Sequence, residues 1–472
     1  MDFRRTDIQA LADQVARKEV SARELAAAAL ARIDAADGEV GAFVAVDAER
    51  ALAEADAVDE RVANGEEVGP LAGVPIGVKD TEDAIGFRTT YGSKLWEDAP
   101  PATEDSVLVA RLRQAGCVIV GKTNAPELAW KADTDNRVFG RTGNPWSLER
   151  SAGGSSGGSS AAVAAGMVPM ATGSDGGGSL RIPGSLCGLT TLKPSLGRVP
   201  AGGPNPPAWA DLSSKGVLVQ TARETAAALD AVIGPEPTDL RSLPMPDESW
   251  LDAVEGIGAP HRVLWSPTLG YAEVDSEVAA VCAKAVATLE GLGTEVIAVD
   301  DVFDEDPGVP WLQLSLTSNL RVIERRDPDG ERWGELDEDL AAMLGWVRAT
   351  AGPTTALEVS DLAHRLNLRL VELFHRAPLL LTPTVGGQTP VGAAYGTVDG
   401  VESPTWVGFT YPFNLTRSPA GTVCAGFTSD GMPVGLQVVG PQHADVAVLR
   451  LLAVLEHALG VDARCRWEPT GA

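Results

Sequence analysis

Two glycine- and serine-rich clusters are the parts of this chain best suited to chemistry. The first covers residues 153–158 with the sequence GGSSGG, and the second covers residues 174–179 with the sequence SDGGGS. Glycine allows a ligand to approach the main chain closely, and each cluster places a serine hydroxyl among exposed backbone N–H groups. This combination suits the binding of a developing oxyanion.

Glycine-serine runs also occur as flexible linkers and as phosphate-binding loops. The first cluster leads into the helix-forming run AAVAA at 161–165, and Asp175 and Arg181 accompany the second, which a spacer does not need. No Gly-Lys-Ser/Thr follows either cluster, so neither is a P-loop. Residues 153–157 match the G-x-S-x-G nucleophile elbow, but residues 144–150 before them are poor strand formers, so we interpret the match as chance.

A lysine follows a short apolar segment upstream of both clusters. Residues 74–78 have the apolar run of a buried strand, and Lys79 comes directly after them. Lysine is seldom fully buried without a partner. From these residues alone, Lys79 is either an exposed turn residue or a buried group with a specific function.

The stretch from Ser151 to Pro183 closely resembles the signature of the amidase signature family of serine amidohydrolases. The matching features are GGSSGG, the small-residue helix, an acidic residue before glycines and a serine, and Arg-x-Pro. Residues 184–194, with the sequence GSLCGLTTLKP, continue the resemblance. Similar segments at 71–80, 121–146 and 411–441 extend it over most of the chain.

The resemblance implies a Ser-Ser-Lys triad that hydrolyses amides through an acyl-enzyme. By position in the motif, Ser179 is the nucleophile, Ser155 is the bridging serine that follows a cis peptide bond, and Lys79 is the base. Lysine accepts a proton only when it is neutral, so we expect Lys79 to be buried with a lowered pKa. No histidine lies near either serine cluster in sequence, which leaves a Ser-His-Asp arrangement without local support.

The resemblance also assigns the oxyanion hole to the main chain of the second cluster. The N–H groups expected to bind the oxyanion belong to Gly176, Gly177, Gly178 and Ser179. Many family members carry Thr or Ile where this chain has Gly176. The donors are main-chain groups and do not depend on that side chain, but the rigidity of the loop can differ.

Further residues are expected around the triad. Ser156, Asp175 and Arg181 are expected to support it, with Asp175 and Arg181 forming a buried ion pair that braces the glycine loop; an exposed ion pair is the alternative. By resemblance, Ala129 and Trp130 line the acyl pocket, whereas a role in the core is the alternative for Trp130.

Other elements can be predicted from periodicity and capping residues. Amphipathic helices are predicted at residues 8–20, 21–36 and 47–63. Ser21, with Glu24 in a capping box, and Asp47 are the expected N-caps of the second and third helices. Further predicted elements are strands at 262–265 and 294–299 and helices at 277–292, 311–352, 356–374 and 445–459.

The resemblance implies an α/β amidase-signature fold, a single domain with a twisted mixed β-sheet flanked by helices on both faces. We expect one amidase domain over residues 1–472, with a helical lead-in (1–66), a signature core (67–234), a variable region that shapes the substrate funnel (235–384) and a C-terminal return to the core (385–472). Homodimers are common among such enzymes, so a homodimer is one expected state.

The composition excludes several classes of function. The net charge is −27, so the chain lacks the basic excess with which proteins bind nucleic acids. No apolar run is long enough to cross a membrane, and the N-terminus has no apolar signal segment. The 5 cysteines form no C-x-x-C pair and the 5 histidines have no ligand spacing. We therefore expect a cytoplasmic protein with free thiols and with neither metal nor cofactor.

Three functions compete. The first is a hydrolase of small uncharged, aryl or oligomeric amides, or of related esters and carbamates (urethanes), similar in pattern to bacterial aryl acylamidases and 6-aminohexanoate cyclic-dimer hydrolases. The second is the A-type subunit of a tRNA-dependent amidotransferase, a class that typically has Arg-Gln-Pro where this chain has Arg-Ile-Pro at 181–183. The third is a non-catalytic scaffold, which the joint presence of Lys79, Ser155 and Ser179 disfavours.

Overall fold

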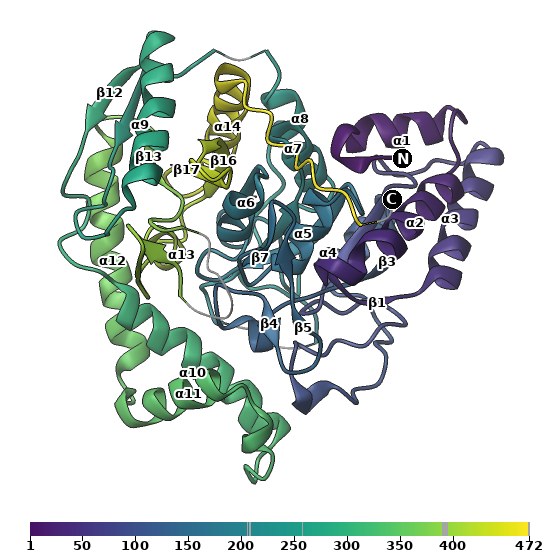
Figure 1. Cartoon of the computed structure of the whole chain (residues 1–472), viewed down its shortest axis with the longest axis horizontal. Helices are drawn as coiled ribbons and strands as arrows, with labels where there is room; N and C mark the ends of the chain where they lie inside the picture. The colour runs from purple at the N-terminus through teal and green to yellow at the C-terminus, as the bar shows by residue number, and fades with distance from the viewer. Residues whose placement is uncertain (205, 207–208, 257, 389–394, 471–472) are drawn as a thin grey trace.

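The computed structural model describes residues 1–204, 206, 209–256, 258–388 and 395–470. Residues 389–394 and 471–472 of the predicted C-terminal region therefore lie outside the described residues. The N-terminal helices α1 (Ile8–Ala16), α2 (Ala22–Val40) and α3 (Ala48–Ala63) lie together at one end of the molecule, near both chain termini (Figure 1).

Local sequence signals set the ends of these helices. The Ser21 and Glu24 capping box begins α2, and the Asp47 side chain accepts a hydrogen bond from the Arg50 N–H at the start of α3, which confirms both predicted N-caps. Helix α2 runs four residues beyond its predicted end and stops at Gly41, whose left-handed conformation (φ 66°) suits glycine.

Two mixed sheets form the centre of the molecule. The first has the strand order β1-β3-β2-β8-β10 and the second the order β12-β11-β13-β17-β16-β9. The strands of the first sheet are β1 (Phe43–Val46), β2 (Pro75–Lys79), β3 (Val118–Thr123), β8 (Met170–Asp175) and β10 (Ser214–Leu218). The strands of the second are β9 (Thr191–Lys193), β11 (Arg262–Trp265), β12 (Glu295–Ala298), β13 (Leu380–Pro383), β16 (Ala420–Phe427) and β17 (Pro433–Val439).

The two sheets meet at their edges. A single β-bridge between Thr190 and Val219 connects the ends of β9 and β10, so the predicted continuous sheet is interrupted at this point. Helices pack against both sheets, among them α5 (Gly157–Ala164) on β2 and β8, and α6 (Arg181–Cys187), α9 (Ser276–Gly291) and α14 (Asp445–Leu459) on β16. The predicted α/β fold is confirmed.

Shorter elements complete the chain. Helix α4 (Val107–Gln114) connects β2 to β3, helices α7 (Ala222–Asp230) and α8 (Trp250–Ala253) connect β10 to β11, and α13 (Pro412–Leu415) precedes β16. Small two-stranded pairs are formed by β4 (Asp135–Asn136) with β5 (Gly140–Arg141), β6 (Gly143–Asn144) with β7 (Ser147–Ser151), and β14 (Thr397–Val398) with β15 (Val401–Glu402). Although we judged residues 144–150 to be poor strand formers, β7 begins there at Ser147 and pairs with β6.

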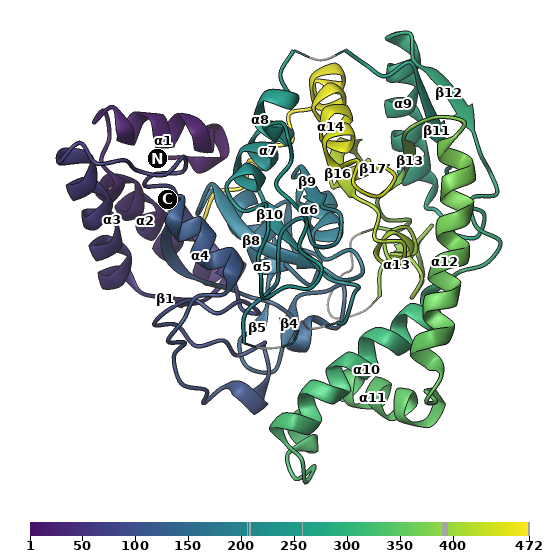
Figure 2. The ribbon, with the colours of Figure 1, turned by 180° about the vertical axis from the view of Figure 1, so that it is seen from behind.

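Three long helices lie between β12 and β13 in the chain. Helices α10 (Gly308–Arg326) and α11 (Glu338–Thr350) extend away from the sheets, and α12 (Thr355–Phe374) returns along the second sheet, as Figure 2 shows from behind. The prediction of one helix over 311–352 was wrong: Asp327 ends α10, and a turn through Pro328 and Gly330 separates it from α11. Among the described residues, no helix combines the length and the apolar character needed to cross a membrane.

The core lies around the parallel strands of the first sheet. Strands β2, β3 and β8 are buried along their whole length, as is typical of parallel strands covered on both faces. Strands β2 and β8 run parallel, with Ile76 opposite Met170 and Gly77 opposite Ala171. Their carboxyl ends therefore meet at one edge, which brings Lys79 close to the second glycine-serine cluster.

Candidate active site

Three segments that lie far apart in the sequence converge at this edge. Lys79 is the last residue of β2, Ser155 lies in the loop before α5, and Ser179 lies in the loop that joins β8 to α6. Helix α5 is buried along its whole length, and its Gly, Ser and Ala side chains allow it to pack closely on β8. This close packing positions the first cluster beside the second.

Lys79 is fully buried and surrounded by serine hydroxyls. Its Nζ lies 2.8 Å from Ser155 Oγ, 2.9 Å from Ser156 Oγ and 3.1 Å from Ser174 Oγ. Within the described part of the chain, no carboxylate forms an ion pair with it. Burial lowers the pKa of Lys79 to about 7, the nearby charge of Lys215 acts in the same direction, and carboxylates further away oppose the shift. The predicted buried lysine with a lowered pKa is therefore present.

The two serines of the predicted triad differ in their exposure. Ser155, which follows a cis peptide bond with Gly154, is 1% exposed, whereas Ser179 is 9% exposed. Ser155 accepts a hydrogen bond from Lys79. Both serines line the same cavity, so the hydroxyl bonded to the lysine and the hydroxyl open to a ligand face one space.

The loop between these elements leaves no room for side chains on its glycines. A Cβ atom on Gly176 would lie 2.5 Å from the Trp209 ring, and one on Gly177 would lie 2.1 Å from the Trp311 ring. The Trp311 indole N–H donates a hydrogen bond of 2.8 Å to the Gly176 carbonyl. Trp209 thus occupies the space beside Gly176, and Trp311 occupies the space beside Gly177.

The main-chain N–H groups of the loop fall into two sets, one bonded within the protein and one without an acceptor among the described residues. The Gly178 N–H donates to Asp175 Oδ1 at 2.7 Å, so this predicted oxyanion donor already has an acceptor. Among the described residues, we find no acceptor for the N–H groups of Gly176, Gly177 and Ser179. These three groups remain able to bind an oxyanion.

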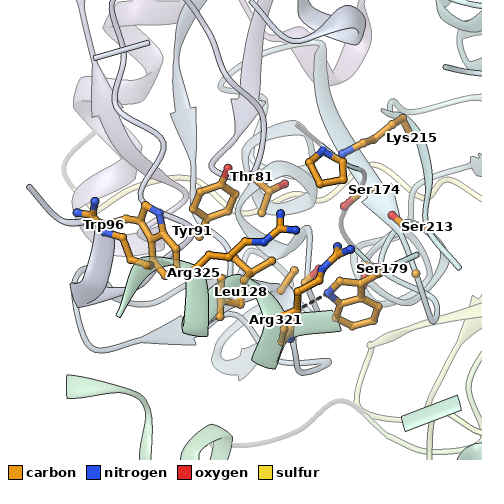
Figure 3. A pocket seen from close by; sticks show the side chains of 18 residues that line it. Thr81, Tyr91, Trp96, Leu128, Ser174, Ser179, Ser213, Lys215, Arg321 and Arg325 are labelled. Atoms are coloured by element: carbon orange, nitrogen blue, oxygen red, sulfur yellow. Dashed lines mark hydrogen bonds between the residues drawn. The ribbon is translucent and has the colours of Figure 1, made fainter. Parts of the chain in front are cut away.

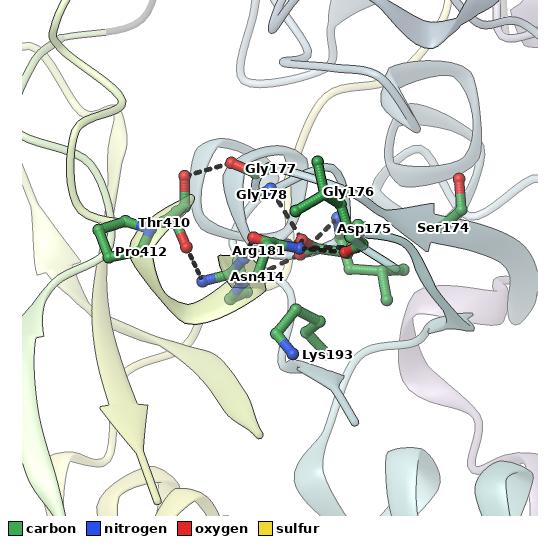
Figure 4. A network of polar contacts seen from close by, with 12 residues as sticks. Ser174, Asp175, Gly176, Gly177, Gly178, Arg181, Lys193, Thr410, Pro412 and Asn414 are labelled. Carbon is green, nitrogen blue, oxygen red and sulfur yellow. Dashed lines mark hydrogen bonds and ion pairs between the residues drawn. The ribbon is translucent and has the colours of Figure 1, made fainter. Parts of the chain in front are cut away.

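A buried ion pair braces the glycine loop, as predicted. Arg181 and Asp175 are fully buried and form two hydrogen bonds, with distances of 2.8 and 2.9 Å. The guanidinium also donates to the Thr410 carbonyl and to Asn414 Oδ1 (Figure 4). It donates to Gln437 Oε1 as well. Burial alone would raise the pKa of Asp175, but the Arg181 charge holds it well below its usual range. The pair therefore stays ionised and links the glycine loop to the C-terminal segment.

Replacing Arg181 with glutamine is expected to lower the free energy of unfolding by about 3–5 kcal/mol, because the Asp175 carboxylate would remain buried without its cation. Thermal and urea unfolding of the purified variant measure this loss. The double variant Asp175→Asn/Arg181→Gln should recover part of it. The matched control is Arg262→Gln, which breaks an exposed ion pair with Glu295 and should change the free energy by less than about 1 kcal/mol. Equal effects of the buried and exposed substitutions would contradict the bracing role.

Two cavities meet at Ser179. The smaller, of about 380 Å³, is lined by Ser155, Ser174 and Gly176 together with apolar and cationic side chains. The larger, of about 600 Å³, is lined by Gly177 and by an aromatic wall of Trp130, Trp209, Trp311, Trp406 and Tyr411. The Trp311 and Tyr411 rings are stacked with their centroids 5.2 Å apart.

The structure brings the predicted residues together and adds others. Ala129 lines both cavities, and Trp130 lines the larger one. Sequence reasoning did not single out Ser174 as a lysine partner, although it belongs to the second cluster, or Trp209 and Lys215, for which no motif was recognised. Among the described residues, no cluster of His, Cys, Asp and Glu could hold a metal ion.

Comparisons with known proteins agree on one family. The model of the Amidase family matches residues 24–449. The chain is 37% identical to an acylamidase of Rhodococcus erythropolis over 94% of both chains. It is 35% identical to the A-type subunit of the glutamyl-tRNA(Gln) amidotransferase of Moorella thermoacetica over 95% of both chains.

Solved structures share the whole fold. A bacterial aryl acylamidase of the amidase signature enzymes superposes with a TM-score of 0.91 at 27% identity, covering 99% of each chain. A 6-aminohexanoate cyclic dimer hydrolase complexed with substrate superposes with a TM-score of 0.86 at 31% identity, covering 100% of this chain and 99% of that one.

Proposed function

Because this chain belongs to the Amidase family and is an amide-hydrolysing enzyme, we propose that Lys79, Ser155 and Ser179 cleave its substrates through an acyl-enzyme. The observation that carries this proposal is the buried Lys79 Nζ, 2.8 Å from Ser155 Oγ and with a pKa lowered to about 7. A neutral amine in this position can accept a proton near neutral pH.

In the proposed reaction, Lys79 takes a proton from Ser155, and Ser155 takes one from Ser179. The Ser179 oxygen attacks the amide carbonyl, and the resulting oxyanion accepts hydrogen bonds from main-chain N–H groups of Gly176, Gly177 and Ser179. Ser155 then returns the proton to the amide nitrogen, the C–N bond breaks, and the amine leaves. Water enters, gives its proton to the same relay and releases the acid from Ser179.

We propose that the substrates are small amides with an uncharged acyl part and preferably with an aromatic ring in the acyl or the amine part. The aromatic wall of the larger cavity supports this proposal, as do the acylamidase and aryl acylamidase among the relatives. The 6-aminohexanoate cyclic dimer hydrolase supports oligomeric amides as a second class. Esters and carbamates react by the same attack, so urethanase activity is part of the proposal.

4-Nitroacetanilide is expected to be hydrolysed with a kcat/KM at least about tenfold above that of free glutamine. Glutamine carries two charges on its acyl part, and their desolvation in a cavity with mostly apolar walls is unfavourable. Release of 4-nitroaniline and of ammonia measures the two reactions. A preference for glutamine would contradict the proposed substrate class and favour the amidotransferase function.

The amidotransferase alternative rests on the 35% identity with an A-type subunit of that class. In this chain Ile182 stands where that class typically has glutamine, and its side chain lines the larger cavity. Co-purification of a second subunit together with glutaminase activity would support this alternative.

We also propose three properties of the whole protein. Five free, buried cysteines among the described residues are consistent with a cytoplasmic location. A homodimer remains our proposal for the assembly. A single domain whose region 235–384 shapes the substrate funnel is supported by α10, which contributes Trp311 to the larger cavity and Arg325 to the smaller.

A further inference from the structure

The smaller cavity beside Ser179 collects positive charge in an acidic protein. Its lining includes Lys215, Arg321, Arg325 and Arg326, and no carboxylate of the described residues lines it, although the chain as a whole has a net charge of −27. Figure 3 shows the guanidinium groups of Arg321 and Arg325 directed into the space that Ser179 and Ser174 border, with Lys215 on its far side. The net negative charge of the protein repels anions, whereas the cations that line this cavity attract them.

Some of these cations form ion pairs with carboxylates, and one does not. Lys215 forms an ion pair with Glu82, and Arg326 forms one with Asp98 while its guanidinium lies 5.8 Å from the centre of the Trp96 ring. Within the described residues, the Arg325 side chain is exposed and forms neither an ion pair nor a hydrogen bond. Arg325 therefore supplies an uncompensated positive charge to the cavity.

The proposed proton relay decides which half of the substrate enters this cavity. Ser155 returns the proton to the departing nitrogen, so that nitrogen must face the Ser155 side of Ser179. Ser155 lines the smaller cavity and is absent from the lining of the larger one. The amine half of the substrate thus occupies the cationic cavity, and the acyl half occupies the aromatic cavity.

We propose that the preferred substrates carry a carboxylate on their amine half, as N-acyl aminobenzoates and N-acyl derivatives of short amino acids do. This inference rests on the proposed function. The apolar side chains of Tyr91, Trp96 and Leu128 and a volume of about 380 Å³ suit a single aromatic ring or a short alkyl chain ending in the carboxylate. Hydrolysis adds one water and releases the acyl part as an acid and the amine half as an aminocarboxylate.

A matched pair of anilides tests the inference: 4-acetamidobenzoate carries a carboxylate where 4-acetamidoacetophenone carries a neutral methyl ketone of similar size. The ketone makes the aniline the better leaving group, so chemistry alone favours the neutral compound. We expect the wild-type kcat/KM for the benzoate to be about tenfold higher, because a hydrogen bond to a charged group outweighs that advantage. Chromatographic detection of both anilines gives the ratio.

Substitutions of Arg325 assign the preference to the cavity. Arg325→Glu should bring the benzoate-to-ketone ratio below one, whereas Arg325→Lys should keep it above one. The matched control is Arg365→Glu, which reverses the charge of an exposed α12 arginine outside both cavities and should leave the ratio unchanged. Because each ratio compares two substrates on the same preparation, partial misfolding cancels.

The outcomes separate this inference from the proposed function. Hydrolysis of both anilides with a wild-type ratio of one or less would overturn the carboxylate site and leave the amidase mechanism standing. Hydrolysis of neither, together with no fluorophosphonate adduct on Ser179, would overturn the mechanism. In that case, calorimetry still decides whether the cavity selects a carboxylate. It compares the affinities of 4-aminobenzoate and 4-aminoacetophenone for the wild type and for Arg325→Glu.

Discussion

Replacing Ser179 with alanine is expected to lower kcat for 4-nitroacetanilide by at least about 10⁴-fold, because the variant lacks the hydroxyl that forms the acyl-enzyme. Ser179 is the more exposed of the two triad serines, and it borders both cavities. The same substitution should abolish the single mass adduct that a fluorophosphonate forms with the wild-type protein. Intact-protein mass spectrometry measures the adduct, and release of 4-nitroaniline measures kcat.

The matched control is Ser213→Ala, which removes another serine hydroxyl from the lining of the smaller cavity. This variant should still take the fluorophosphonate adduct. An adduct that persists in Ser179→Ala would place the nucleophile elsewhere. A wild-type protein that takes no adduct would favour the amidotransferase or scaffold functions, since the site would be incomplete without a partner or inactive.

The residues of the proposed triad could be located from the sequence because they are close in sequence or end recognisable elements. The first serine cluster leads into α5, the second cluster follows one strand later at the end of β8, and Lys79 ends a strand that its apolar run identifies. The capping residues Ser21 and Asp47 fixed two helix starts for the same reason, since a cap acts within its own helical turn.

Other features depend on contacts that no local pattern records. The cavities combine the loops of the signature core with α10, which lies more than a hundred residues later in the chain. Trp209 and Trp311 occupy the space beside Gly176 and Gly177, and only the three-dimensional structure shows that these glycines have no room for a side chain. The helix predicted over 311–352 was too long because helical periodicity continues on both sides of Pro328, whose turn was not recognised.

The structure shows where charges lie, which the net charge from the sequence does not. Composition indicated an acidic protein without the basic excess that nucleic-acid binding through a basic face requires. It could not reveal that Arg325, from the variable region, and Lys215, from the signature core, line one cavity. A net charge describes the whole surface, whereas substrate selection depends on the few charges within a Debye length of the reacting bond.

For Lys79, we expect kcat/KM of the wild-type enzyme to fall about tenfold for each pH unit below 7 and to level off above it. The sign follows from the mechanism: burial lowers the pKa of Lys79 to about 7, the neutral amine is the active form, and acid converts it to an ammonium that cannot accept a proton. Lys79→Arg should lose both the activity and the inflection, because arginine stays protonated throughout. Initial rates with 4-nitroacetanilide between pH 5.5 and 9 measure the profile.

A second buried lysine provides the control that this experiment needs. Burial, followed by the charge of Arg181, also lowers the pKa of Lys193 to about 7, so the profile alone does not identify the titrating group. The Lys193 Nζ donates to the Pro194 carbonyl and lines neither cavity at Ser179. Lys193→Met should therefore retain the inflection near pH 7, whereas Lys79→Met should lose it together with the activity. An inflection that disappears with Lys193 and survives the loss of Lys79 would remove Lys79 from the role of base.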